Sequence, residues 1–196
     1  MTDITTADIK ALREATGLSV MQCRKALEEA GGDMEKARII LQKKGGEIAL
    51  KKGDRVLGAG CIAAYIHASG TIGVMLELSC ETDFVGKNPE FKQVAYDIAM
   101  HVAATNPSYL KREDISAEER TKVSETFKNE VKDKPAEMQD KILAGKVDAY
   151  FADKVLLEQT FIKNPDQTIQ DVVNGAVQKF GERTEIRRYV RFAVSE

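Results

Sequence analysis

The residues best suited to chemistry in this sequence are its cysteines and its two histidines. Cys80 with His67 or His101 could form a nucleophile and its base, because a thiol reacts as the thiolate and needs a proton acceptor nearby. Cysteines in strands are more often small core residues, so a structural Cys80 is favoured and a thiol enzyme is the alternative. His101 borders the apolar stripe of its helix, where a hydrogen-bonded, interfacial imidazole is expected rather than a catalytic base.

Sequence patterns for metal ions, nucleotides and nucleic acids are weak or missing. Neither histidine has a neighbour at metal-ligand spacing, and the sequence contains no GxxxxGK[ST] motif and no GxGxxG motif after a strand. Arg187, Arg188 and Arg191 could touch phosphate, but aromatic residues are interleaved with them and pairing with acidic neighbours is expected instead. We therefore expect no catalytic residue, no metal, no cofactor and no direct contact with nucleic acid.

The composition is that of an ordinary soluble protein. The 196 residues are 43% hydrophobic and 31% charged, with a net charge of −2, so no polyanionic partner is indicated. The three cysteines lie far apart and form no disulfide framework, which fits a reducing cytoplasm. The N-terminus lacks the features of a signal peptide and no apolar run approaches membrane-spanning length, so a cytoplasmic protein without membrane contact is expected.

The segment 80–88 is the most informative stretch, because it places the aromatic Phe84 among polar residues between two regular elements. Residues 73–78 predict a strand before it, and Asn88 followed by proline predicts the start of a helix after it. Since apolar side chains usually lie inside, Phe84 is expected to fold back onto the core. The alternative is an exposed anchor for a binding partner, held in a rigid connection.

The first fifty residues predict three short helices. Residues 6–15 form the first, Ser19 with Gln22 three positions later predicts a capping box at the start of the second, and Asp33 caps a third that ends at the glycine pair 45–46. A basic, flexible segment over 49–55 follows. The expected result is a compact three-helix module.

The second of these helices also carries a candidate binding patch. Its apolar residues at helical spacing form one stripe: Val20, Cys23, Leu27 and Ala30. Met21 lies off this stripe and is therefore expected to be exposed. An adaptable methionine beside Val20 suits a small surface for binding another protein.

The rest of the chain predicts an α+β core in the order β-β-α-(α-α)-β-α-β. Strands are expected over 61–67, 71–78, 155–162 and 185–194, and helices over 89–105 and 168–180. A charged region at about 113–153 predicts a helical hairpin that projects from the core.

The predicted helix 89–105 has apolar residues on two sides. One side carries Phe91, Val94, Ala95, Ile98 and Val102, and the other carries Tyr96, Met100 and Ala103. A helix of this kind must be covered twice, by its own domain or by a second molecule. A core of this size is expected to cover one side only, which favours a homodimer.

Three ordered groups of motifs resemble the bacterial translation elongation factor Ts family. Residues 12–17, 21–27 and 32–37 resemble its N-terminal signature, 81–85 with Asn88 its second signature, and 98–104 with Pro107 its third; residues 188–192 fit as well. The resemblance covers essentially the whole chain. It departs from the family at Ser19-Val20-Met21-Gln22, where members commonly carry Gly-Met-Met-Asp.

The resemblance implies a fold and a function. The fold is α+β, with a ubiquitin-associated-like three-helix module over 1–55 and a core over 56–196 that has an antiparallel sheet packed with helices. The function is that of a guanine nucleotide exchange factor for the GTPase elongation factor Tu, acting by binding and without covalent chemistry. Because this is the family's short form, a homodimer is implied. A peptide-binding or ubiquitin-like-protein-binding module is the alternative function.

The resemblance also implies contact residues. Asp83 and Phe84, flanked by Thr82 and Val85, would press into the G domain of elongation factor Tu near its Mg²⁺ and phosphate site. A second group, Arg13, Val20 and Met21, would hold another helix of that partner, and His101 would lie at the contact.

Overall fold

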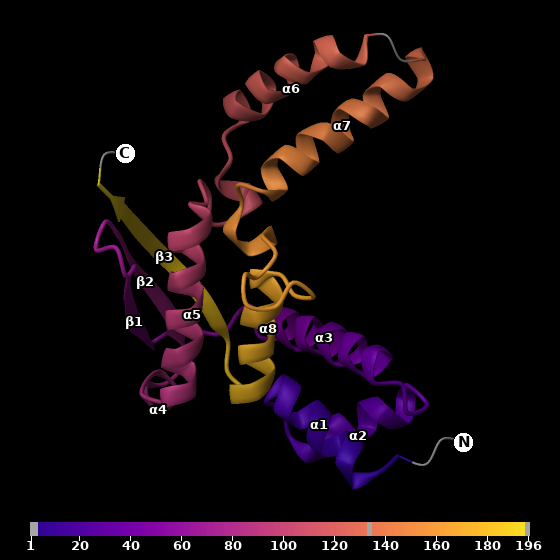
Figure 1. Ribbon diagram of the computed structural model, residues 1–196, viewed down its shortest axis with the longest axis vertical. Coiled ribbons are helices and arrows are strands. Elements are labelled where there is room, and N and C mark those ends of the chain that lie inside the picture. Colours follow the sequence, from indigo (N-terminus) through magenta and orange to yellow (C-terminus); the bar gives the residue numbers. More distant parts are fainter. Residues whose placement is uncertain (1–3, 133–134, 195–196) are drawn as a thin grey trace.

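The structure is a computed structural model that describes residues 4–132 and 135–194. It has an N-terminal group of helices, an α+β core and a helical hairpin, and the hairpin and the first two helices lie at opposite ends of the molecule (Figure 1). The predicted α+β class is therefore confirmed. Within the described residues, no helix combines the length and the apolar character needed to cross a membrane.

The N-terminal helices are α1 (Thr6–Thr16), α2 (Val20–Glu29) and α3 (Met34–Lys51). The expected capping box at Ser19 and Gln22 is present, and Asp33 caps α3 by accepting a hydrogen bond from the backbone N–H of Lys36. The three helices enclose their own apolar cluster, built from Leu12, Leu18, Cys23, Ala26, Leu27, Ala37 and Leu41.

The prediction that the third helix ends at Gly45-Gly46 is wrong. Helix α3 continues to Lys51, because the two glycines face helix α8 (Ile169–Phe180) at close range. A Cβ atom at Gly45 would lie 3.1 Å from Oε1 of Gln178 and 3.4 Å from the backbone oxygen of Asn174. The close packing of the two helices offsets the helix-weakening effect of glycine. Part of the predicted flexible segment is therefore helical.

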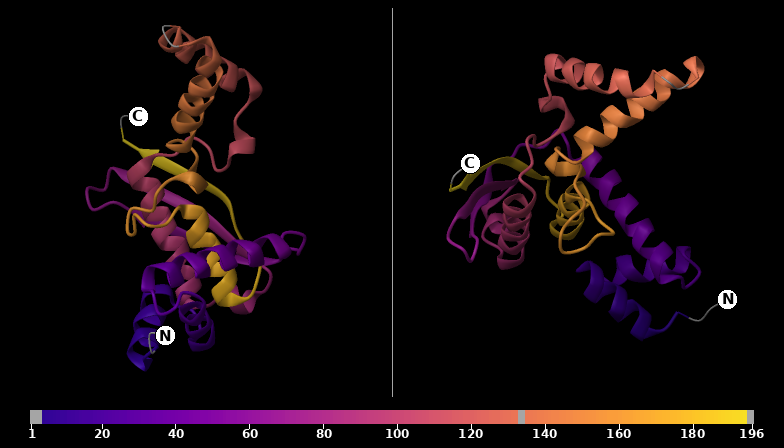
Figure 2. Two further views of the ribbon diagram at one scale, coloured as in Figure 1. Left: turned by 90° about the vertical axis from the view of Figure 1, so that its right-hand side faces the viewer. Right: turned by 45° about the horizontal axis from the view of Figure 1, so that its top comes forward.

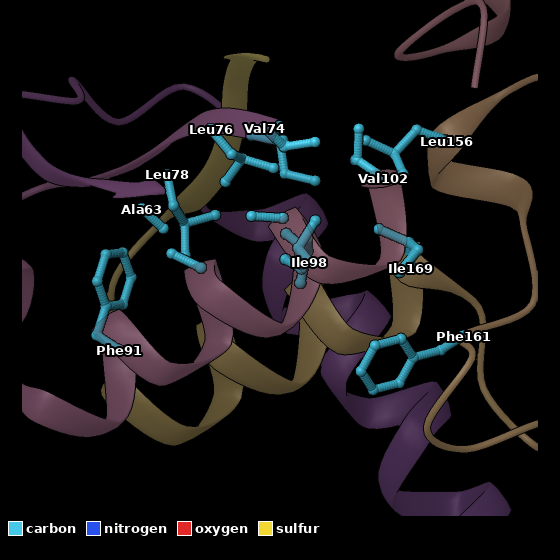
Figure 3. Close-up of a cluster of buried hydrophobic side chains, with 14 of the residues drawn as sticks. Ala63, Val74, Leu76, Leu78, Phe91, Ile98, Val102, Leu156, Phe161 and Ile169 are labelled. Atoms are coloured by element: carbon cyan, nitrogen blue, oxygen red, sulfur yellow. The ribbon is translucent and has the colours of Figure 1, made fainter. Parts of the chain in front are cut away.

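A three-stranded antiparallel sheet forms the centre of the core. Its order is β1 (Ala59–Ile66), β2 (Ile72–Cys80) and β3 (Thr184–Ala193), with an irregularity in the β2 and β3 pairing between Glu77 and Leu78. Helix α5 (Pro89–Thr105) and helix α8 pack on one face of this sheet. Figure 3 shows the strand residues Leu76 and Leu78 opposite Ile98 and Phe91 of α5.

The predicted strand over 155–162 is wrong. This segment contains a single 3₁₀ turn, Leu156–Glu158, and isolated bridges pair Val155 with Tyr109 and Thr160 with Thr168. Leu156 is fully buried and its backbone N–H donates to the oxygen of Tyr109. The apolar run is thus buried as an irregular connection with local partners, which periodicity cannot distinguish from a buried strand.

Helix α5 is covered mainly by its own chain, but Tyr96 on its second side is exposed, and the expected second molecule there stays a prediction. Ala103 is buried and its backbone oxygen accepts a hydrogen bond from Nε of Arg191. Tyr96 is 41% exposed, and its ring packs edge-on against Tyr65 with 5.6 Å between ring centroids. A group of exposed apolar residues also lies on the outer face of the sheet: Ile62, Ile66, Met75, Val190 and Phe192.

The predicted hairpin is confirmed. Helices α6 (Ala117–Val131) and α7 (Ala136–Ala152) stand away from the sheet and its covering helices in each view (Figures 1 and 2). A small apolar cluster at the base contains Ile115, Phe151 and Val155. Arg112 lies beside it, between the carboxylates of Asp148 and Glu158.

Candidate protein-binding surface

The connection after β2 contains a four-residue helix, α4 (Asp83–Gly86), that presents Phe84 to solvent. Phe84 is 82% exposed, whereas the next residue, Val85, is 4% exposed and belongs to the core. Successive helical residues point about 100° apart, so burial of Val85 turns Phe84 outward. The expectation that Phe84 folds back onto the core is wrong. We call residues 82–86 the Phe84 tip.

The Phe84 tip lies closely against the start of strand β1. A Cβ atom at Gly86 would be only 2.8 Å from the backbone oxygen of Gly60, so no larger residue fits without movement. After the tip, the Asn88 side chain accepts a hydrogen bond from the backbone N–H of Glu90 at 2.8 Å and starts α5 as the sequence predicts. The tip is therefore held on both sides by regular structure.

Polar groups at the tip have two partners, Lys87 directly after α4 and Glu182 in the loop before β3. Lys87 donates to Oδ2 of Asp83 at 2.5 Å, and this hydrogen bond lowers the pKa of the Asp83 carboxyl below its usual value. Thr82 contacts the carboxylate of Glu182 through both its backbone N–H and its hydroxyl. The tip thus offers one exposed aromatic ring beside a carboxylate that stays ionised at neutral pH.

A second exposed apolar group lies at the start of α2. Met21 is 63% exposed, as predicted, and Val20 is 52% exposed although its spacing had placed it on the buried stripe. The interior side of α2 is occupied by Cys23, Ala26 and Leu27 instead. Arg13, in the last turn of α1, is also exposed. We call Val20 and Met21 the α2 patch.

His101 does not lie on the surface that the resemblance implies. Its side chain is fully buried, and its Nε2 lies 2.9 Å from Oε1 of Gln159. Its Nδ1 accepts a hydrogen bond from the backbone N–H of Ile162 at 3.4 Å, which assigns the proton to Nε2. Burial lowers the pKa of the imidazole, so it is neutral at pH 7. His101 therefore holds the segment 159–162 from inside and, like Val85, does not reach the surface.

The thiol-enzyme alternative finds no support in the geometry of Cys80. Its side chain is buried, and its Sγ donates to the backbone oxygen of Thr82 at 3.1 Å. Burial raises the pKa of this thiol to about 11, so the reactive thiolate is scarce. His67 bonds to Ser69 in the β1 and β2 turn, and His101 bonds to Gln159, so each imidazole has a partner other than Cys80.

The exposed apolar side chains of the Phe84 tip and the α2 patch suit the binding of another protein. Within residues 4–132 and 135–194, no group of three or more His, Cys, Asp or Glu side chains could hold a metal ion. A groove of about 1220 Å³ between α3, α8 and β3 contains none of the eight predicted contact residues. Six of those eight are exposed, on α1, at the start of α2, and on the Phe84 tip.

Glu182 is the residue at this surface that sequence reasoning missed. It follows α8, and its two hydrogen bonds reach a residue 100 positions earlier in the chain. A single glutamate in a loop carries no local signal of such a partner. Gly60 and Gly86 were missed for the same reason: a Cβ atom at Gly86 would meet the backbone of Gly60, and one at Gly60 would meet the backbone of Leu78.

Comparison with known proteins gives one consistent result. The family model described as "Elongation factor TS" matches residues 5–196. Elongation factor Ts of Thermotoga petrophila is 47% identical over 96% of this chain and 94% of its own length. Elongation factor Ts of Thermodesulfovibrio yellowstonii is 49% identical over 98% of this chain and 97% of its own length, and that of Moorella thermoacetica is 45% identical over 98% and 96%.

Proposed function

Since this chain belongs to the elongation factor Ts family, we propose that it is a guanine nucleotide exchange factor for the GTPase elongation factor Tu in translation elongation. The observation that carries the proposal is Phe84, which is 82% exposed on a short helix that is held on both sides. Exposure of a large aromatic ring is unfavourable unless a partner covers it. The activity requires binding only, with no covalent step, and its site of action is the cytoplasm.

The proposed mechanism is a wedge formed by the Phe84 tip. Phe84 and the ionised Asp83 would enter the G domain of elongation factor Tu near its Mg²⁺ and phosphate site, with Thr82 at the edge and Val85 anchoring the tip from inside. If the chain binds the nucleotide-free partner more tightly than the nucleotide-bound one, linkage requires the nucleotide to bind correspondingly more weakly. Each 1.4 kcal/mol of this coupling changes nucleotide affinity about tenfold. The burial of a few groups in the partner is therefore enough to weaken nucleotide binding substantially.

The α2 patch with Arg13 forms the second part of the proposed contact. An apolar pair beside an exposed arginine suits a helix of the partner that offers apolar and acidic side chains. We propose that residues 1–55 form a module that holds the partner at this point, while the core, residues 56–196, carries the tip. His101, being buried, contributes by holding the core around α5 rather than by touching the partner.

We also propose that two copies of the chain associate through the outer face of the sheet. Ile62, Ile66, Met75, Val190 and Phe192 are each between 43% and 67% exposed on that face. Burying such a surface against its own copy is favourable, and symmetric dimers are the commonest soluble oligomers. In this proposal the dimer contact lies on the sheet, whereas the sequence favours the second side of α5.

Release of a fluorescent GDP from elongation factor Tu, with and without this chain, tests the proposed function. We expect release to accelerate with increasing concentration of the chain and to reach a plateau. A chain that binds the partner without accelerating release would contradict the exchange function. Cys80→Ser is a useful companion variant, since an exchange factor retains its activity and a thiol enzyme loses it.

A further inference from the structure

The Phe84 tip begins where the backbone pairing of β2 with β3 ends. Beyond that point the two segments are joined by hydrogen bonds to side-chain carboxylates. The last pair of the β2 and β3 ladder is Cys80 with Thr184. Beyond this pair, the Glu81 carboxylate accepts a hydrogen bond from the backbone N–H of Arg183 at 2.5 Å. Glu182 in turn accepts from Thr82, so each segment supplies a carboxylate to a backbone N–H of the other.

The contact between Glu182 and Thr82 consists of two hydrogen bonds to one carboxylate. Oε2 accepts from the backbone N–H of Thr82 at 2.9 Å, and Oε1 accepts from its hydroxyl at 2.6 Å. Hydrogen bonds to an ionised acceptor are stronger than neutral ones, and a pair of them fixes orientation as well as position. Both the backbone and the side-chain rotamer of Thr82 are therefore set by Glu182.

Thr82 occupies the N-cap position of α4 but does not cap it in the usual way. A threonine there normally accepts a hydrogen bond from a backbone N–H of the helix that follows. In this structure the hydroxyl of Thr82 makes no such bond and points to Glu182. A helix of four residues has little stability of its own, so the direction of α4 depends on contacts from outside it.

We propose that Glu182 is a positioning residue for nucleotide exchange, because its carboxylate fixes Thr82 and thereby the direction in which Phe84 leaves the protein. This inference rests on the proposed exchange function, in which Phe84 enters elongation factor Tu. Glu182 itself does not touch the partner in this account. It acts through Thr82 and α4.

The contact should affect orientation more than overall stability. Thr82 is exposed and Glu182 is half-buried, so water can replace the two hydrogen bonds when the carboxylate is removed. Val85 and Gly86 remain packed on the core in that case. We therefore expect Glu182→Gln to leave the melting temperature of the protein almost unchanged.

The first measurement compares Glu182→Gln and Glu182→Ala with Glu185→Gln. Glu185 carries a carboxylate three residues later, at the start of β3. Its partner is the guanidinium of Arg183 and not a residue of the tip. At a site open to water, where each hydrogen bond contributes at the low end of its usual range, the loss of two corresponds to roughly a tenfold change in rate. We expect Glu182→Ala to lower the maximal rate of GDP release about tenfold, with a smaller change in the half-saturating concentration. Glu182→Gln, whose amide oxygen can still accept from the Thr82 backbone N–H, should lower it less, and Glu185→Gln should leave both quantities unchanged.

Combination with Phe84→Ala separates positioning from a general structural role. If Glu182 acts by directing Phe84, Glu182→Gln should cause no further loss of exchange once the ring is absent. If Glu182→Gln lowers the exchange rate by the same factor in the unmodified chain and in Phe84→Ala, the proposal is overturned.

Hydrogen–deuterium exchange of the chain without its partner gives a readout that does not depend on activity. We expect faster exchange in peptides covering 81–88 for Glu182→Gln and unchanged exchange for Glu185→Gln. Unaltered exchange there, together with an unaltered maximal rate, would overturn the proposal. If the unmodified chain does not accelerate GDP release, the exchange function fails, and deuterium uptake still decides whether Glu182 orders the tip.

Discussion

Two helix starts present the apolar side chains proposed to meet the partner, and they are built in different ways. At the start of α2, Ser19 and Gln22 cap each other: the Ser19 hydroxyl accepts from the backbone N–H of Gln22, and the Gln22 side chain accepts from the backbone N–H of Ser19. At the start of α4, Thr82 turns away from its own helix to Glu182, which lies 100 positions later.

The comparison shows that an exposed anchor can be held by local or by distant contacts. The cap at the α2 patch uses only residues within one turn of the chain, and the buried residues of α2 pack within the N-terminal module. The Phe84 tip needs the start of β3 and the glycine contact with β1.

Phe84→Ala should have the largest effect. Truncating a central aromatic anchor typically costs about 2 kcal/mol or more, which corresponds to about a thirtyfold loss of exchange rate. The variant should fold normally because the ring is exposed. Leu50→Ala is the matched control, since Leu50 is 83% exposed on α3 and lies in neither anchor region. GDP-release kinetics check both, and a wild-type rate for well-folded Phe84→Ala would falsify the wedge.

Charges on the outer sheet face should have the next largest effect. Met75→Glu combined with Phe192→Glu places carboxylates in the proposed dimer contact and should give a folded monomer with about tenfold lower exchange, because like charges at an apolar interface are strongly unfavourable. Tyr96→Glu with Met100→Glu is the comparison, directed at the second side of α5. Light scattering measures the mass of each. A monomer for the unmodified chain at micromolar concentration, still active, would refute the dimer.

Truncation of the α2 patch should have a smaller effect of a different kind. Val20→Ala with Met21→Ala removes apolar contact area and should cost about 1 kcal/mol of partner binding, or roughly a fivefold rise in the half-saturating concentration. The maximal rate should stay the same because the tip is intact. Ile39→Ala, half-exposed in the same module, serves as the control. A fall in maximal rate instead would mean that the two regions do not act separately.

The smallest effect is expected at His101, which belongs to neither region. Burial lowers its pKa in the folded protein below the ordinary 6.5, so the unfolded chain takes up a proton first as pH falls. Its contribution to stability is therefore present above about pH 6.5 and decreases below it. Urea unfolding at several pH values should show a smaller decrease in the free energy of unfolding between pH 7 and 5.5 for His101→Gln than for the unmodified protein. Parallel profiles for His101→Gln and wild type would exclude this role.

The prediction of the fold succeeded where signals act within a few residues. The capping residues Ser19, Asp33 and Asn88 begin helices at the expected positions, and the alternation from Ile72 to Leu78 places its apolar side chains in the core. The prediction failed where burial replaced local preference. Gly45 lies inside a helix because α8 packs against it, and Leu156 is buried in a connection that reads as a strand.

The sequence by itself determined the α+β class, the three N-terminal helices, the helical hairpin and the residue types of the proposed contact. Tertiary structure alone decided which of those contact residues are exposed and can reach a partner. Phe84 points outward because the neighbouring Val85 packs in the core. His101 is absent from the surface because it is buried and hydrogen-bonded to Gln159 and Ile162. Caps and periodicity arise from neighbours in sequence, whereas exposure depends on which distant segments cover a side chain, and no local pattern records that choice.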